Sequence, residues 1–299
     1  METVPPRRTC GTMEVHYRLL ETYPEYRQNI SGIERFAARH ALLGGTRRTE
    51  TIRIPTVVHV VYNTDAQNIA DSQVTSQIEA LNRDYQAKND QTSVPAPFSG
   101  VIGNPQVQFF LPATDPNGAA TNGITRTKTT TTSFPQDDSV KSAASGGADP
   151  WPSDKYLNLW VCPLGGGLLG YAQFPGGPPA TDGVVLLHAA VGTNGTATAP
   201  YADGRSAVHE VGHWLNLIHI WGDTTDCSGS DYVDDTPTQQ NPNYGTPTFP
   251  HISCNNGPNG DMFMNYMDYV DDDAMVMFSQ GQIVRMNATI DGPRSSVWQ

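Results

Sequence analysis

Three histidines and one glutamate in the second half of the chain have the spacing of a metal site. His209 and Glu210 begin the sequence HEVGH, which His213 completes, and His219 follows six residues later. On a helix, residues four apart share a face, so His209 and His213 can bind one zinc ion with Glu210 beside them. Eight His and eight Glu in 299 residues would produce HExxH by chance only about 0.006 times. The spacing predicts a site where Glu210 takes a proton from zinc-bound water, which then attacks a carbonyl.

The third histidine sets a condition on the backbone. A continuous helix would carry His219 away from His213 along its axis, so the chain must turn sharply near Asn216. Such a turn needs a left-handed residue, which Gly adopts most easily and Asn next. We therefore expect the zinc-site helix to end close to Asn216.

The rest of the sequence predicts the elements that position this site. Asp71 could cap a helix that continues to about residue 87, and residues 13–43 could form one or two short helices. Segments 112–155 and 222–262 have the composition of loops. Apolar, β-branched runs predict five strands, at 52–62, 107–111, 157–162, 169–174 and 183–188. The pattern indicates a mixed sheet with few helices and an irregular C-terminal part.

Charge divides the chain near residue 50. The formal net charge is -12, yet residues 1–50 hold eight Arg against six Glu, which leaves -14 for the remainder. An acidic chain does not offset phosphate charge, and no apolar run approaches the roughly 18 residues of a membrane span. We therefore expect neither nucleic-acid nor membrane partners. The charge step and the basic linker at 44–49 predict a boundary between a leader, residues 1–48, and a main domain, residues 49–299.

The zinc motif resembles that of a known family. HEVGHWLNLIH is similar to the extended signature of metzincin metallopeptidases, and NYMDY at 265–269 is similar to their Met-turn. With YLNLWVC and GGGLLGYAQFPGG, the resemblance is closest to the pappalysin (cytophagalysin) family, over roughly residues 50–290. It implies a secreted zinc endopeptidase with an α+β, metzincin-like catalytic domain: a mixed, mostly parallel five-stranded sheet, a zinc-site helix and an irregular C-terminal subdomain. The subdomains would be about 49–219 and 220–299.

The resemblance also assigns roles to single residues. It implies zinc ligands at His209, His213 and His219, the general base at Glu210, and an apolar floor under the metal at Met267. Tyr269 matches a tyrosine that donates to the developing oxyanion.

Four cysteines complete these assignments. Cys10, in RTCGT, resembles a cysteine switch, in which a thiolate takes the zinc position that water needs and keeps the enzyme latent. A tail thiol without a role, or a bridge from Cys10 to Cys162, is the alternative. Cys227 and Cys254 match the family's disulfide, and Cys162 reads as a buried thiol. No signal peptide is visible at residues 1–6, so the protein is either cytosolic or secreted with its signal peptide already removed; the resemblance favours secretion.

Two acidic segments suggest further binding sites. The loop after the zinc helix is rich in Asp, and the resemblance implies structural calcium there, bound by Asp231, Thr236, the Val233 carbonyl and Asp223. A solvated acidic loop is the alternative.

A second acidic segment, residues 271–273, follows the Met-turn. A carboxylate there would favour Arg or Lys after the scissile bond, with Asp273 as first candidate. The linker bonds Thr46–Arg47 and Arg47–Arg48 would then be sites of self-cleavage.

The sequence leaves two other functions open. One is a non-catalytic zinc and calcium binding or adhesion protein on the same fold, and the other is a zinc amidase acting on a non-peptide bond. Glu210 argues for an enzyme, because a structural zinc site has no use for this base. We expect protein or peptide substrates that pair with an edge strand near residues 165–174, and the leader as an internal partner. The oligomeric state stays undetermined.

Overall fold

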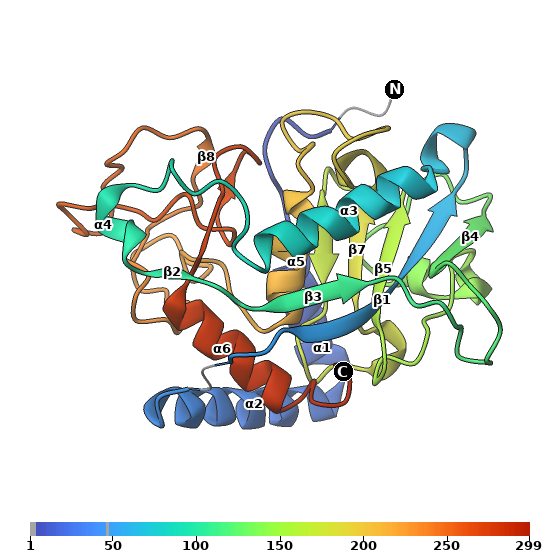
Figure 1. The fold of residues 1–299 in the computed structure, drawn as a ribbon, viewed down its shortest axis with the longest axis horizontal. Helices are drawn as coiled ribbons and strands as arrows, with labels where there is room; N and C mark the ends of the chain where they lie inside the picture. Colours follow the sequence, from blue (N-terminus) through green and yellow to red (C-terminus); the bar gives the residue numbers. More distant parts are fainter. Residues whose placement is uncertain (1–3, 46–47) are drawn as a thin grey trace.

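A mixed sheet forms the centre of the computed structural model, which describes residues 4–45 and 48–299 (Figure 1). Its strand order is β3-β1-β5-β7-β6. All neighbouring strands on this path are parallel except β6, which is antiparallel to β7. These are the five strands that the sequence predicts: β1 (Ile52–Tyr62), β3 (Val107–Phe110), β5 (Leu157–Cys162), β6 (Gly170–Ala172) and β7 (Val184–Leu187).

A sixth strand, β4 (Ile124–Lys128), also pairs in parallel with β1 and lies in a segment that the sequence predicts as loop. The amides of Ile52 and Val58 donate to the carbonyls of Gln106 and Gly123, just before β3 and β4. Because alternate amides of a strand point to the same edge, β3 and β4 lie one after the other along one edge of β1. The sheet is therefore five positions wide. The polar sequence of β4, ITRTK, lacks the apolar alternation that identifies a strand.

Apolar side chains cover both faces of the sheet. On one face, Val58 and Val60 belong to the same buried cluster as apolar residues of α3 (Asp71–Asp84) and α5 (Arg205–Trp214). On the other, Val61 and Trp160 pack with apolar residues of the 129–155 segment and of helix α1 (Thr12–Thr22). β1 is buried on both faces, which explains its nearly continuous apolar sequence.

Helix α3 ends three residues before its predicted limit, and Asp71 is its first residue instead of its cap. The Asp71 carboxylate instead accepts a hydrogen bond from Asn122 and forms an ion pair with Arg126.

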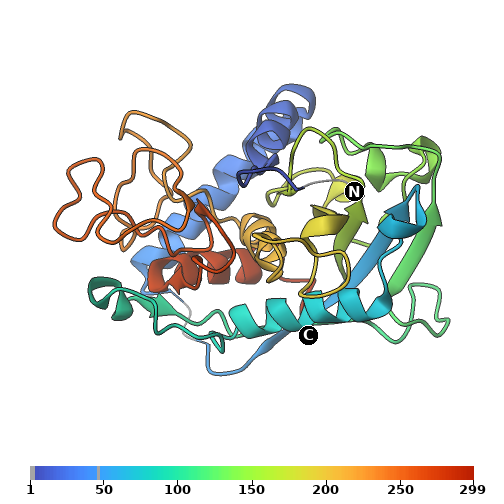
Figure 2. The same cartoon turned by 90° about the horizontal axis from the view of Figure 1, so that it is seen from above.

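The leader forms two helices, where the sequence suggested one or two short ones: α1 (Thr12–Thr22) and the longer α2 (Pro24–Leu42). α1 contacts β6, and α2 packs against the C-terminal helix α6 (Gln280–Asp291). In both views, α5 lies between α3 and the leader helices (Figures 1 and 2). The zinc-site helix is therefore enclosed by the leader on one side and by the main domain on the other.

The chain after α5 is mostly irregular, as expected. Within it, β8 (Tyr244–Gly245) pairs in parallel with β9 (Tyr269–Val270), and β10 (Phe278–Ser279) pairs with β2 (Ile102–Gly103). The predicted disulfide between Cys227 and Cys254 is present. Short elements complete the fold: helix α4 (Ala96–Ser99) and 3-10 turns at 65–67, 139–141, 143–145, 179–181 and 188–190.

Cys10 and Cys162 are both buried and neither forms a disulfide, which excludes the alternative bridge. Among the residues that the structure describes, no helix is both long enough and apolar enough to cross a membrane.

Candidate metal centre and active site

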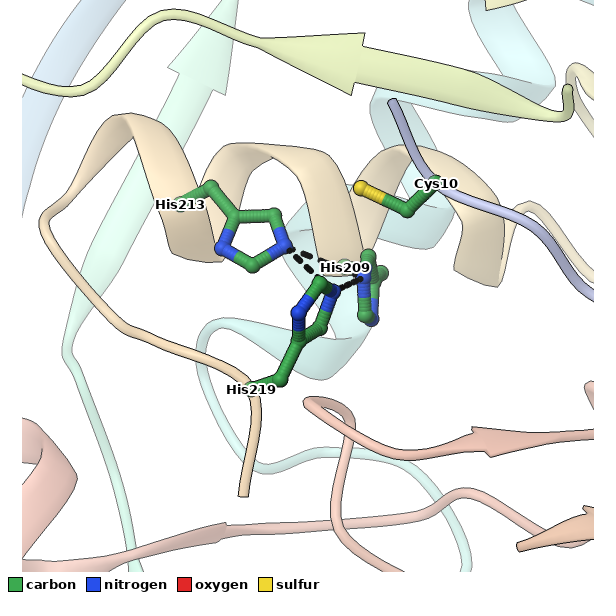
Figure 3. Close-up of side chains that lie close together, drawn as sticks. All are labelled: Cys10, His209, His213 and His219. Atoms are coloured by element: carbon green, nitrogen blue, oxygen red, sulfur yellow. Dashed lines mark hydrogen bonds between the residues drawn. The ribbon is translucent and has the colours of Figure 1, made fainter. Parts of the chain in front are cut away.

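Three imidazole rings converge at the end of α5 (Figure 3). The Nε2 atom of His213 lies 3.1 Å from those of His209 and His219, which are 3.3 Å apart. Tetrahedral zinc with Zn–N bonds of about 2.05 Å needs ligand nitrogens about 3.3 Å apart. The spacing of the three rings therefore fits zinc.

Each ring is oriented by a hydrogen bond at its other nitrogen. The Nδ1 atoms lie 2.7 Å from the Tyr266 carbonyl for His209, and 2.8 Å from the Leu217 carbonyl for His213. For His219 the partner is Asp223 Oδ1, at 2.6 Å. Acceptors at all three positions keep Nδ1 protonated, so three Nε2 lone pairs point at one another. A cation stabilises that arrangement, whereas neutral rings alone do not.

Helix α5 ends where the zinc motif requires. Its last residue is Trp214, and Asn216 has φ 71°, the left-handed conformation expected there. The Leu217 amide turns back to the Gly212 carbonyl at 2.9 Å. Gly212 itself faces Met267, whose Sδ would lie 2.5 Å from any Cβ at that position. A glycine in HEVGH therefore admits the Met-turn beneath the three histidines.

Glu210 projects from α5 beside the histidines and is buried. Burial raises the pKa of its carboxyl to about 7, although hydrogen bonds from Cys10 and Thr12 act in the opposite direction. β6 passes directly over it, and a Cβ on Gly170 would lie 2.8 Å from Glu210 Cγ. The site thus combines a proton acceptor that can titrate near neutral pH with a metal-ligating cluster.

The leader runs through this site in an extended conformation. Its residues 9–11 pair in parallel with the free edge of β6: the Leu169 amide donates to the Thr9 carbonyl and the Gly11 amide to the Gly170 carbonyl, each at 3.0 Å. This pairing inserts Cys10 among the three histidines (Figure 3), and the four ligand atoms lie within 4.8 Å of one another. The Cys10 Sγ is 3.3 Å from Glu210 Oε2. The thiol thus occupies the space beside the metal position.

Two leader residues that the sequence did not single out support this arrangement. The Thr12 hydroxyl donates to Glu210 Oε2 at 3.0 Å and accepts from the Ala172 amide at 2.8 Å. Arg8 is buried, and its guanidinium donates to Asp272 Oδ1 at 2.5 Å, to Ser206 Oγ and to the Val270 carbonyl. Arg8 and Thr12 both belong to the RTCGT sequence around Cys10. Their closeness to Cys10 in the sequence could have identified them as candidates.

The acidic residue that Arg8 contacts is Asp272, whereas the sequence favoured Asp273 as the first candidate for binding a basic side chain. Asp273 is exposed, whereas Asp272 is buried. Asp272 Oδ2 accepts from the amides of Asp203 and Arg205 at the start of α5, where the helix N-terminus favours a carboxylate. Residues 272–274 form a turn, and only the contacts with the start of α5 distinguish the inward aspartate, so the sequence alone could not identify it.

Tyr269 borders the metal site. Its hydroxyl accepts a hydrogen bond from the Cys10 amide at 3.3 Å, and its ring contacts those of His209 and His219. Burial, followed by the nearby Cys10 and Glu210, raises the Tyr269 pKa. The phenol therefore stays protonated and can donate a hydrogen bond.

The acidic loop brings together three of its four expected calcium ligands. The Thr236 hydroxyl contacts both carboxylate oxygens of Asp231, at 2.9 and 2.8 Å, and the Val233 carbonyl at 2.8 Å. Burial raises the pKa of Asp231 to about 7. Asp223, the fourth, uses one oxygen on His219 instead.

The linker candidates are only partly visible. Thr46 and Arg47 lie outside the described residues. Arg48 rests on α6, where it donates to Asn287 Oδ1 at 3.0 Å and pairs with Asp291.

Comparisons with known proteins agree with this geometry. The pregnancy-associated plasma protein-A family, the pappalysins, matches residues 141–291, just over half of the chain. The extracellular metalloprotease of Pyricularia oryzae is 32% identical over 93% of this chain and 87% of its own length. Extracellular metalloprotease 1 of Coccidioides posadasii is 30% identical over 94% and 88%.

Solved structures from Tannerella forsythia are also similar. A promirolysin variant is 46% identical with a TM-score of 0.88, covering 97% of this chain and 96% of that one. Mature mirolysin in complex with a cleaved peptide is 50% identical with a TM-score of 0.82, covering 83% and 96%. Together with the site geometry, these similarities show that the chain belongs to the pappalysin family of metzincin metallopeptidases and is a zinc metalloendopeptidase.

Proposed function

We propose that this protein is a secreted endopeptidase, made as a latent proenzyme, that cleaves peptide bonds before Arg or Lys. The observation that carries the proposal is the path of the leader, which places Cys10 at the histidines and Arg8 against Asp272 in one extended segment. A peptide with a basic side chain therefore already fits the site. The extracellular relatives support secretion.

The residues of this chain would divide the reaction between them. His209, His213 and His219 would hold zinc, which supplies Lewis acidity and lowers the pKa of a water molecule. Glu210 Oε2 would accept the proton of the attacking water and return it to the leaving amine nitrogen. The Tyr269 hydroxyl would donate to the carbonyl oxygen as it becomes negative. Met267 would fix the floor of the site by packing on Gly212.

Substitution of the general base tests the reaction. We expect Glu210→Gln to lower peptide hydrolysis by at least about 100-fold while the chain still binds one zinc. Zinc content by mass spectrometry and hydrolysis of a peptide library provide the two measurements. A wild-type chain that binds zinc without hydrolysing any peptide would instead favour a binding protein, and hydrolysis of non-peptide amides alone would favour an amidase.

Latency would rest on the leader, about residues 1–48, with residues 49–299 as the catalytic domain. The coverage of promirolysin exceeds that of mature mirolysin by 14% of this chain, about 42 residues, which supports a removable segment of this size. Zinc favours sulfur ligands, so Cys10 would exclude the attacking water. We expect Cys10→Ala to shorten the lag before peptidase activity appears, and an unchanged lag would contradict the switch.

Maturation would be self-cleavage in the linker, at Thr46–Arg47 or Arg47–Arg48. The purified chain incubated alone should yield a new N-terminus at Arg47 or Arg48, identified by mass spectrometry, and Asp272→Asn should reduce this cleavage. A mature N-terminus far from residue 47 would refute the assignment.

Calcium would stabilise the loop around Asp231. A buried carboxylate whose pKa is raised gains most from a divalent cation. The Thr236 hydroxyl and the Val233 carbonyl supply further oxygens. We expect calcium to raise the melting temperature of the wild type and to have little effect on Asp231→Asn. Equal calcium effects on the two proteins would indicate a solvated loop.

A further inference from the structure

An exposed tyrosine, Tyr244, borders the pocket that Arg8 fills. β8 pairs with β9 so that Tyr244 is opposite Tyr269 and Gly245 is opposite Val270. The Val270 carbonyl accepts from Arg8, so the same two strands position the pocket and Tyr244. The ring centroids of Tyr244 and Tyr269 are 6.0 Å apart, and Tyr244 is 38% exposed. Tyr244 is therefore accessible at the rim of the active site.

The leader places a cation on this ring. The guanidinium carbon of Arg7 lies 5.0 Å from the Tyr244 centroid. A guanidinium within about 6 Å of an aromatic face is attracted to it. Arg7 and Thr9 are exposed while Arg8 and Cys10 are buried, as expected for an extended segment lying along a cleft. The site thus receives two consecutive basic side chains, one in the pocket and one on the rim.

The leader also fixes the order of these positions along the cleft. Cys10 lies at the histidines, Arg8 lies in the Asp272 pocket, and Arg7 lies beyond the pocket on Tyr244. When a substrate residue fills the pocket directly after the scissile bond, the next residue away from the metal site reaches Tyr244. The order from the metal site to the Asp272 pocket to Tyr244 is the same whether the bound peptide runs in the direction of the leader or in the opposite direction.

We propose that Tyr244 is a specificity-determining residue that binds a basic side chain in the second position after the scissile bond. Preferred substrates then carry two consecutive basic residues, the first paired with Asp272 and the second lying on the Tyr244 ring. This inference rests on the proposed function, because it needs cleavage before a basic residue.

The linker of this chain contains such a pair. Cleavage of Thr46–Arg47 places Arg47 in the pocket and Arg48 on Tyr244. Cleavage of Arg47–Arg48 would instead place Thr49 on the ring, where it gains nothing from the aromatic face. Of the two candidate bonds, the inference therefore selects Thr46–Arg47, and the mature chain begins with Arg47.

Two peptides that differ at one position test the inference. After the scissile bond one carries Arg–Arg and the other Arg–Ala, and each is cleaved by the full chain after maturation in the presence of zinc. We expect kcat/KM for the Arg–Arg peptide to be higher by about two- to fivefold, the range for an exposed cation–aromatic contact. Tyr244→Ala should bring this ratio close to one, and Tyr244→Phe should preserve it. The compared quantity is the ratio of kcat/KM for the two peptides, measured for each variant. A loss of activity that affects both peptides equally therefore does not change it.

Controls separate this contact from the general attraction of an acidic protein for basic peptides. Tyr232→Ala removes an exposed tyrosine that contacts Arg285, and it should keep the wild-type ratio. A ratio near one for the wild type, or a ratio unchanged in Tyr244→Ala, overturns the role of Tyr244 while the proposed function stands. Failure to cleave either peptide overturns both.

Discussion

In the proposed mechanism Glu210 is the general base, and the leader contacts proposed to keep the enzyme latent converge on this residue. Glu210 is buried, faces Gly170 of β6, and contacts both Cys10 and Thr12 of the leader. The Thr12 hydroxyl therefore does more than pack: it binds the carboxylate that would accept a proton, and it links the leader to the Ala172 amide. The leader engages the base as well as the metal ligands.

Removing that hydroxyl should weaken the leader without changing the enzyme. A hydrogen bond to a charged group contributes about 1.5–3 kcal/mol, so we expect Thr12→Val to hasten the appearance of mature enzyme by roughly tenfold or more. Thr12→Ser keeps the hydroxyl and is the matched control, with wild-type timing. The measurement is a time course of leader loss by mass spectrometry, and equal timing for Thr12→Val and Thr12→Ser would refute the role of the hydroxyl.

At the scale of elements, the two ends of α5 build the site. Its N-terminus receives Asp272, which forms the pocket, and its C-terminus ends at the left-handed Asn216 so that His219 can return to the other ligands. Asn216 has a further contact: its side-chain amide donates to Glu34 of α2 at 3.1 Å. The same Glu34 pairs with Arg285 of α6, whose Nε donates to the Asn216 carbonyl. The turn that completes the metal site is also a docking point for the leader.

Strand β1 contains one histidine, His59, which is only 1% exposed. Its Nδ1 lies 2.8 Å from Thr125 Oγ1 of β4 and its Nε2 lies 2.9 Å from Asn158 Oδ1 of β5. The ring thus connects β1 to the strands on both of its edges. Burial lowers the pKa of His59 from 6.5 to about 4, so the folded sheet contains the neutral ring.

This lowered pKa predicts how stability depends on pH. Between the folded and the unfolded pKa, the unfolded chain binds more protons than the folded one, so the free energy of unfolding decreases as the pH falls from about 6.5 to about 4. The contribution of His59 is about 3 kcal/mol. Urea denaturation of wild type and His59→Gln at several pH values measures it: the difference between their stabilities should shrink toward pH 4. A difference independent of pH would show that His59 does not titrate in this way.

At the scale of the whole molecule, a leader with a net charge of +3, from eight Arg and five Glu in residues 1–48, covers an acidic main domain. The ion pairs between them differ in exposure. Arg8–Asp272 is 1% exposed at both side chains, whereas Arg18 of the Arg18–Asp138 pair is 34% exposed. Salt screens exposed pairs much more than buried ones, so only part of the leader's attachment should respond to ionic strength.

Hydrogen–deuterium exchange of α1 and α2 tests this difference. Raising sodium chloride from about 0.05 to about 0.5 M should increase exchange of the leader amides by up to about fivefold, since one exposed pair contributes up to about 1 kcal/mol. Arg18→Gln should reduce the salt dependence. Arg8→Gln should increase exchange at all salt concentrations and leave the salt dependence intact. The reverse pattern would refute the assignment of the two pairs.

The sequence by itself determined what depends on short-range spacing. HEVGH and His219 identified the metal site, and Asn216 marked the turn, because helical periodicity and left-handed propensity are local properties. The five apolar strands were predictable for the same reason, since burial on one or both faces is recorded in their side chains. Strand β4 was not predictable from the sequence, because its side chains are polar. It forms a strand because it pairs with the part of β1 that lies beyond β3.

Only the tertiary structure decided which distant residues meet. Three consecutive aspartates follow the Met-turn, and nothing local distinguishes Asp272 from Asp273. The start of α5, about 67 residues earlier in the chain, selects Asp272 by offering backbone amides to its carboxylate. The contacts of Thr12 with Glu210 and of Arg7 with Tyr244 likewise arise because the leader pairs with the free edge of β6. Contacts of this kind depend on which distant segments pair along the edge of the sheet, and the spacing of residues in the sequence contains no information about that pairing.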